Sequence, residues 1–381
     1  MRGLSFSPGL RLGLTVFCPL RGLAFDIRAS VARFAGLLFP VHVMEWDAAL
    51  VCARRQSDLW LSGLKISEEI TMQSRTFAAL LLSALTVTTF AQSGPPRPKI
   101  TGISHLAVYT SDAAAAEHYY AGTLGAAKLA DPENPAGVKY AFSPTQYIEV
   151  LPLPANSGVN RLDHIAFNTT SAEGLRNYLA AKGWKVPAHI ESGADGSRWF
   201  AVLDPESIKI EFVQPPAHPA PVNAPNAIGH HIIHCGMLVH SREAEDKFYR
   251  DLLGFRPYWW GGMQTGKVDW VSQQVPDAHD WIEYMLTSGP SGTGIPATIS
   301  QQSLGVLDHF SIGEVSVPDA YKVLQAGNRL DGRHDQGPKI GRDGKYQFNM
   351  YDPDGIRAEL MNFHATDKPC CSEFTATDPA E

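Results

Sequence analysis

Cysteine is scarce in this chain: there are five in 381 residues, and only Cys235, Cys370 and Cys371 follow residue 91. Three cysteines cannot build a disulfide framework, so we expect hydrophobic cores to stabilise the fold. The adjacent Cys370 and Cys371 leave several interpretations open, namely a vicinal bridge, a bond to another chain, a metal site or two thiols in an exposed tail. The exposed tail is the preferred one.

Runs of lysine and arginine are absent after residue 91, and the formal net charge is −7. This balance argues against a surface that must neutralise nucleic-acid phosphates. With 44% hydrophobic and 19% charged residues the chain has an ordinary globular composition. We therefore expect a small-molecule substrate as the partner, with no nucleic acid and no membrane association after signal cleavage. The sequence leaves open whether the chain forms a homo-oligomer.

The apolar run at 77–85 is too short to span a bilayer comfortably. It follows Arg75 and precedes Thr89-Phe90-Ala91, which is the charged, apolar and small-residue order of a secretory signal. We therefore predict a signal peptide over 72–91, a non-native upstream extension over 1–71, and export to the periplasm or medium if translation starts at Met72. The alternative is a genuine disordered or membrane-associated extension with a buried apolar helix over 77–90.

One pattern occurs four times: a strand-like run with a histidine is followed 44 to 50 residues later by a strand-like run with a glutamate. The pairs are His105 with Glu149, His164 with Glu211, His234 with Glu283, and His309 with Glu359. The first and third histidines are 129 residues apart, and the second and fourth are 145 apart. Such self-similarity indicates a duplicated pair of modules in the order A, B, A′, B′.

The proline-dense stretch 215–227 lies between the two copies. Proline cannot donate to a strand ladder or continue a helix, so this stretch is predicted to be a linker. The predicted domains are 92–214 and 228–366. Residues 367–381 are predicted to be a flexible tail.

Each module reads as a strand, a helix and then several short β-rich runs. The predicted helices cover 113–121 and 171–182, and Ser241 begins the equivalent helix of A′. Thr170 and Glu173 have the spacing of a capping box. The fold class predicted from these units is α+β, built from βαβββ modules.

Strand alternation places each histidine and glutamate on the face opposite the apolar residues. Two modules packed edge to edge would bring two histidines and two glutamates into one cup, which is a ligand set for a divalent metal. A single strand histidine is more often structural, but four matched pairs favour metal binding. The second half is preferred as the active site, because duplicated halves often keep only one.

These motifs resemble the vicinal oxygen chelate superfamily, which includes glyoxalases, bleomycin resistance proteins and extradiol dioxygenases. The resemblance is carried by Ile103-Ser104-His105, Leu162-Asp163-His164, Leu307-Asp308-His309, and Asp352-Pro353-Asp354-Gly355 with Glu359. It covers residues 100 to 365 and implies four βαβββ modules paired into two cup-shaped half-barrel domains.

The similarity to extradiol dioxygenases implies an Fe²⁺ centre held by His234, His309 and Glu359, which leaves positions open for a catecholate and dioxygen. It also implies His334 as the candidate acid/base, with Tyr351 or Tyr346 as a candidate catalytic substitute. Asn349 stands where those enzymes usually carry a tyrosine.

Two other functions remain open. A glyoxalase-like isomerase or lyase would use all four ligands of one half with Zn²⁺, Ni²⁺ or Mn²⁺, and a bleomycin-resistance-like protein would bind its ligand without catalysis. The aromatic residues Tyr258, Trp259, Trp260, Trp270 and Trp281 suit either a ligand platform or core packing, and core packing is preferred.

The signal-peptide hypothesis predicts the N-terminus of the mature protein. If the gene is expressed from Met72 in a bacterial host with an export pathway, cleavage after Ala91 should leave Gln92 as the first residue. N-terminal sequencing of the exported protein checks this outcome. Recovery of an uncleaved chain in the cytoplasm would contradict it.

Overall fold

The computed structural model describes residues 14–16, 25–27, 94–287 and 300–381, without the side chains of 14–16, 25–27 and 301–303. The chain divides into two compact units, Met1–Phe90 and Ala91–Glu381. In the first unit, β1 (Leu14–Val16) pairs antiparallel with β2 (Phe25–Ile27). The predicted signal peptide over 72–91 lies outside the described residues. None of the described helices combines the length and apolar character needed to cross a membrane.

The first half of the second unit forms one eight-stranded sheet. Its strands are β3 (Ile100–Thr110), β4 (Ala127–Ala130), β5 (Val138–Ser143), β6 (Gln146–Pro152), β7 (Leu162–Thr169), β8 (Glu191–Ser192), β9 (Arg198–Leu203) and β10 (Lys209–Gln214). They lie in the order β4-β5-β6-β3-β7-β10-β9-β8. The opening strands β3 and β7 pair antiparallel at the centre, and each has its own closing strand, β6 or β10, parallel beside it.

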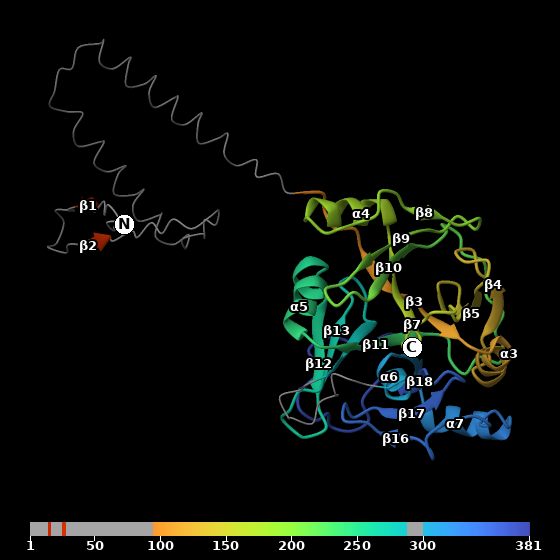
Figure 1. Ribbon diagram of the computed structural model, residues 1–381. Coiled ribbons are helices and arrows are strands. Elements are labelled where there is room, and N and C mark those ends of the chain that lie inside the picture. Colours follow the sequence, from red (N-terminus) through yellow and green to blue (C-terminus); the bar gives the residue numbers. More distant parts are fainter. Residues whose placement is uncertain (1–13, 17–24, 28–93, 288–299) are drawn as a thin grey trace, which may run out of the picture. The chain divides into compact units, whose positions relative to one another are not determined.

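The second half repeats this sheet. Its strands are β11 (Ile232–Val239), β12 (Arg256–Gly261), β13 (Trp270–Gln274), β14 (Trp281–Leu286), β15 (His309–Glu314), β16 (Lys339–Ile340), β17 (Tyr346–Tyr351) and β18 (Arg357–Asn362). Their order, β12-β13-β14-β11-β15-β18-β17-β16, matches the first sheet strand for strand. The predicted α+β class, with four βαβββ modules in two curled half-barrels, is confirmed (Figure 1).

A helix follows the opening strand of each module, and α6 (Gln301–Leu307) precedes β15. The module helices are α3 (Ala113–Glu117) continuing into the π-helix η2 (His118–Thr123), α4 (Ala172–Ala181), α5 (Arg242–Asp246) continuing into the π-helix η3 (Lys247–Leu252), and α7 (Val317–Ala326). Ser241 caps α5 as predicted. The cap of α4 is Ser171 and not Thr170, because the Ser171 hydroxyl accepts the Gly174 N–H at 3.1 Å from an extended backbone.

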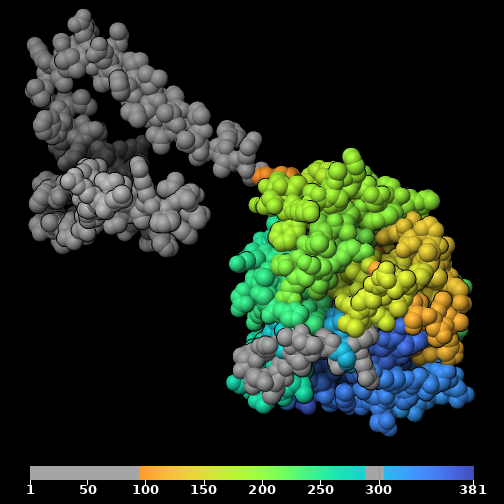
Figure 2. All heavy atoms as spheres, viewed as in Figure 1, coloured from red at the N-terminus to blue at the C-terminus, as the bar shows by residue number. Residues whose placement is uncertain are grey.

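The two halves share one hydrophobic core. Trp184 packs on Phe248 and Phe167 on Phe255, with ring centroids 4.8 and 5.2 Å apart. On the other side the Tyr120 hydroxyl donates to Asp352 at 2.8 Å. Module B thus packs against A′, and A against B′, so that the gold and blue surfaces meet in Figure 2.

Equivalent residues tie the halves together at the sheet edges. The Gln146 side-chain amide accepts a hydrogen bond from the Ile232 N–H and donates one to the Ile232 carbonyl, each at 2.9 Å. The Asp280 carboxylate accepts the Ile103 N–H at 2.9 Å. Ile103 and Ile232 are 129 residues apart, and Gln146 and Asp280 each precede a closing-strand glutamate by three. The contact between the halves is therefore reciprocal, as in a two-fold dimer.

The segment 367–381, predicted to be a flexible tail, instead packs against the second half. The Asp378 carboxylate pairs with the fully buried Lys345 ammonium at 2.9 Å and accepts the Tyr258 hydroxyl. The Phe374 ring lies 4.9 Å from that of Tyr258. The tail is ordered because it supplies the counter-ion of a buried cation and covers aromatic surface.

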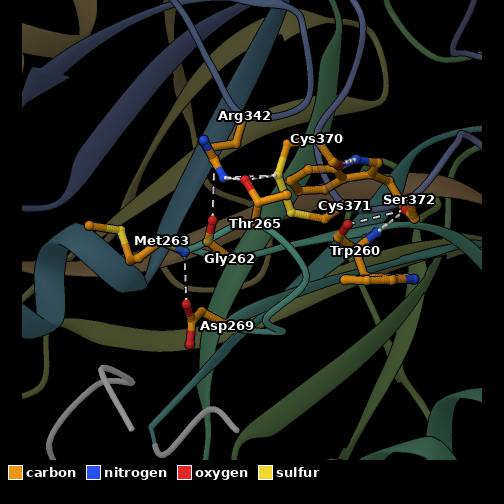
Figure 3. Close-up of a disulfide and its surroundings, with 10 residues drawn as sticks. Trp260, Gly262, Met263, Thr265, Asp269, Arg342, Cys370, Cys371 and Ser372 are labelled. Carbon is orange, nitrogen blue, oxygen red and sulfur yellow. Dashed lines mark hydrogen bonds between the residues drawn. A yellow bond between two sulfur atoms is a disulfide. The ribbon is translucent and has the colours of Figure 1, made fainter. Parts of the chain in front are cut away.

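Cys370 and Cys371 form a vicinal disulfide in this segment (Figure 3). Arg342 reaches the Cys370 sulfur at 2.9 Å, and the Trp260 N–H donates to the Ser372 hydroxyl at 2.9 Å. The pair is therefore a bridge and not two free thiols. These contacts anchor the start of the tail beside β12.

Asp378→Asn should destabilise the fold by about 3 kcal/mol, because it leaves a buried ammonium without its counter-ion. Burial raises the Asp378 pKa, but Lys345 and the Tyr258 hydroxyl outweigh burial and hold it below its ordinary value. The ion pair thus stabilises the fold above that ordinary value, and the stabilisation is lost as pH falls through the folded-state pKa.

Urea unfolding across the acid range checks this prediction. The exposed Glu373→Gln is the control and should leave the free energy of unfolding unchanged. A variant Asp378→Asn as stable as wild type at neutral pH would contradict the role of the ion pair.

Candidate metal centres

The opening strands bring two histidines together in each half. In the first half His105 on β3 and His164 on β7 face the same side of the central antiparallel pair, with their Nε2 atoms 2.8 Å apart. In the second half the Nε2 atoms of His234 on β11 and His309 on β15 are 3.0 Å apart. The backbone register of the opening strands therefore brings the histidines of the two modules together, as predicted.

The closing strands add two glutamates to each pair. In the first half Glu149 and Glu211 place a carboxylate oxygen 3.7 to 4.0 Å from both histidine Nε2 atoms. In the second half Glu359 lies 3.3 Å from His234 Nε2, and Glu283 lies 3.6 Å from His309 Nε2. All eight predicted ligands thus gather in two clusters: His105, Glu149, His164 and Glu211, and His234, Glu283, His309 and Glu359.

The donor atoms of both clusters fit a divalent cation. The carbonyl of Leu307 accepts a hydrogen bond from His309 Nδ1 at 2.7 Å, so in the neutral ring the Nε2 lone pair is free to bind. That lone pair faces a second imidazole nitrogen, which is repulsive unless a proton or a metal lies between them. In the first half the buried Glu149 Oε2 and Glu211 Oε1 have no hydrogen-bond partner. A metal ion would satisfy these atoms together.

Burial sets the charge state of the ligands. It lowers the pKa of all four histidines, so their rings are neutral at physiological pH. Burial also raises the pKa of Glu149 to about 10 and that of Glu283 to about 8. Glu359 differs: burial acts in the same direction, but Arg357 and the His234 contact outweigh it and lower the pKa. Each cluster therefore combines neutral imidazoles with closely spaced carboxyl groups.

Comparison with known proteins agrees with this geometry. The family model of the Glyoxalase/Bleomycin resistance protein/Dioxygenase superfamily matches residues 102–212 and 231–360. The chain belongs to this superfamily. No curated protein matches the sequence significantly.

Solved structures of superfamily proteins share the fold at low identity. The Mn(II)-bound glyoxalase from Novosphingobium aromaticivorans is 19% identical, with TM-score 0.52 over 70% of this chain and 83% of that one. A catechol 2,3-dioxygenase is 19% identical, with TM-score 0.51 over 72% and 96%. A single-residue variant of homoprotocatechuate 2,3-dioxygenase from B. fuscum is 17% identical, with TM-score 0.52 over 74% of each chain.

The cluster of the second half lies beside a cation, Arg357, that forms no ion pair with another described residue. The equivalent lysine of the first half is paired with a carboxylate. Arg357 shares the cup face of β18 with Glu359 and lies beside His309 in the strand register. Its buried Nε has no hydrogen-bond partner, and no ion pair joins it to another described residue. The equivalent Lys209 pairs with Asp163, which also accepts from His164 Nδ1 at 2.6 Å.

Two predicted catalytic residues do not join the second cluster. His334 Nδ1 lies 2.5 Å from the Asp335 carbonyl, and its ring contacts Phe348. Tyr351 lies under the Arg333 guanidinium and lines a hollow of about 680 Å³ between the halves. Among the described residues, no hydrogen bond or ion pair links either of them to the four ligands.

Asn349, in contrast, lies directly opposite Glu359 in the strand register and shares its face. Its Nδ2 donates to Asp335 at 2.9 Å, and its buried Oδ1 has no partner. The position that usually holds a tyrosine in extradiol dioxygenases thus offers a hydrogen-bond acceptor beside the cluster.

Two features beside the clusters were missed by sequence reasoning. A ring two residues before the closing-strand glutamate stacks on the opening histidine: Tyr147 on His105 and Trp281 on His234, with centroids 4.3 and 4.6 Å apart. The repeated aromatic-Ile-Glu pattern was the available signal. The other ring contacts of the second half, including those to Phe374, are packing, as preferred from the sequence.

Gly236 is the second missed feature. It opposes His309 across the sheet, and a Cβ at this position would lie 1.9 Å from the His309 ring. Its counterpart in the first half is Ala107, which opposes His164.

Gly236→Ala should therefore displace His309 and weaken metal binding in the second half at least about 10-fold. Mn²⁺ titration of the metal-free protein checks this, with Ala107→Gly as the mirrored control that removes a methyl group and obstructs no ligand. Unchanged Mn²⁺ affinity in Gly236→Ala would contradict this role.

Proposed function

We propose that the second half is the catalytic centre of a metal-dependent enzyme that acts on a small molecule with two neighbouring oxygen atoms. The observation that carries this proposal is the buried group His234, His309 and Glu359, whose ligand atoms all lie within 4.8 Å of one another. Glu283 stands slightly apart, with its side chain 15% exposed. Three ligands on one side leave the other side of a metal ion accessible.

Extradiol-type ring cleavage of a catechol is the reaction we favour, with Fe²⁺ as the metal. A metal bound here would supply Lewis acidity to the substrate oxygens and, if it is iron, redox chemistry with dioxygen. The chain's own residues would orient the substrate. Arg357 offers a guanidinium to an anionic oxygen, and Asn349 Oδ1 accepts a hydrogen bond from a hydroxyl group.

A glyoxalase-like isomerase or lyase is the second candidate. Glu283 supports it, because its carboxyl oxygen lies 3.6 Å from His309 Nε2 and completes a four-ligand set. In such a reaction the carboxylate can take a proton from a carbon next to a carbonyl. A binding protein without catalysis is less well supported, because two complete sets of ligand residues are retained.

Oxygen uptake distinguishes these functions. The full-length protein, stripped of metal and reloaded with Fe²⁺ without oxygen, should consume oxygen when catechol and air are added. His309→Ala should lose this activity by more than about 100-fold, since even outer partners of a metal ligand are worth about 10 to 100-fold. His118→Ala, which changes an exposed histidine outside both clusters, is the control.

Failure of the Fe²⁺ protein to consume oxygen with a panel of catechols would overturn the dioxygenase proposal. Isomerisation of a 2-hydroxycarbonyl compound with Mn²⁺ or Ni²⁺, abolished in Glu283→Gln, would support the glyoxalase-like alternative.

Arg357 predicts a preference for anionic substrates. Arg357→Met should raise KM for 3,4-dihydroxybenzoate about 10-fold, because a hydrogen bond to a charged group is worth roughly 1.5 kcal/mol or more. KM for uncharged catechol should change less. Steady-state kinetics check this, with the mirrored Lys209→Met as the control. Equal changes in KM for both substrates would contradict it.

A further inference from the structure

The first cluster has a fifth potential ligand that the second cluster lacks. Glu133, on the loop after β4, groups with His105 and Glu211, with ligand atoms within 4.8 Å of one another. The Tyr147 hydroxyl donates to Glu133 Oε1 at 3.2 Å, and the Tyr147 ring stacks on His105. Tyrosine thus holds the extra carboxyl group at the site.

The second half has neither part of this arrangement. The strand β12 ends at Gly261 and continues into Gly262 and Met263, with no carboxylate at the place of Glu133. Trp281 replaces Tyr147 and has no hydroxyl group to position one. The extra ligand therefore belongs to the first half alone.

Lys139 is the cation nearest to the Tyr147 ring of the first cluster: it lies opposite Glu149 in the strand register, and its ammonium is 3.7 Å from the Tyr147 ring centroid. Glu133 and Glu211 have carboxylate oxygens within 4.8 Å of each other, so two acids lie close together. Among residues 94–287 and 300–381, no lysine or arginine forms an ion pair with Glu133, Glu149 or Glu211. Lys209, the nearest equivalent of Arg357, is paired with Asp163 instead.

We propose that the first half binds a second metal ion through five side chains, His105, His164, Glu133, Glu149 and Glu211, and that this ion is structural. Three carboxylates with two imidazoles form a harder, more anionic donor set than that of the second half, which suits Mn²⁺. Five protein donors leave at most one position of an octahedron open, too few for a chelating substrate. This inference does not depend on the reaction proposed for the second half.

The test uses the full-length chain with the second site disabled by His234→Gln and Glu359→Gln. The metal-free protein is titrated with Mn²⁺ and followed by isothermal calorimetry and by the EPR signal of free Mn²⁺. We expect one bound ion. Glu133→Gln added to this background should weaken binding at least about 10-fold, and Tyr147→Phe should weaken it several-fold. Glu173→Gln, on the exposed side of α4, is the matched control and should have no effect.

A folding measurement separates ligand loss from structural damage. The metal-free Glu133→Gln protein should have a melting temperature equal to or above that of its parent, because one of two closely spaced acids is gone, while the increase caused by Mn²⁺ should shrink. Absence of Mn²⁺ binding in the disabled background, or a Kd unchanged within about twofold by Glu133→Gln, overturns the proposal. The opposite background, His105→Gln with Glu211→Gln, reports the second site alone, so failure of either centre is identified separately.

Discussion

The antiparallel pairing of the two opening strands in each half is the constraint on which the rest of the structure depends. It brings one imidazole from each module together, with the two Nε2 atoms 2.8 Å apart in the first half and 3.0 Å apart in the second. Each closing strand then lies parallel beside its own opening strand, so its glutamate is delivered to the same face. A slip of one residue in either pairing would turn a ligand into the apolar core. The strand register therefore determines whether the histidines and glutamates meet on one face.

Two sheets with the same strand order have acquired different electrostatics. In the first half Asp163 takes up the charge of Lys209 and holds His164, whereas Asp308, its counterpart, accepts the Leu238 N–H and leaves Arg357 without a carboxylate partner among the described residues. The partner of one equivalent aspartate thus differs between the halves: Asp163 pairs with a lysine, whereas Asp308 accepts a backbone N–H. This is how a duplicated scaffold can assign different tasks to its two cups.

The repeat, the βαβββ modules and the gathering of four histidines and four glutamates in two clusters could be predicted from the sequence, because they follow from periodic patterns and matched spacings. What could not be predicted depends on contacts between segments distant in the chain. Glu133 has no counterpart in the other half, so a search for repeats passes over it. The position of His334 is set by its bond to the Asp335 carbonyl and its contact with Phe348, which spacing does not encode. The prediction of a flexible tail did not reveal that Asp378 pairs with a buried lysine, because the two residues are 33 positions apart.

Two equivalent polar side chains join the halves. Gln146 and Asp280 occupy equivalent positions and satisfy backbone groups of equivalent strands in the opposite half, at Ile232 and Ile103. Both positions lie three residues before a closing-strand glutamate, so the contacts between the halves lie next to candidate metal ligands. A change that loosens the union would tilt β6 and β14 and move Glu149 and Glu283. The linker residues 215–227 connect the halves covalently, but these reciprocal hydrogen bonds couple the geometry of one cup to that of the other.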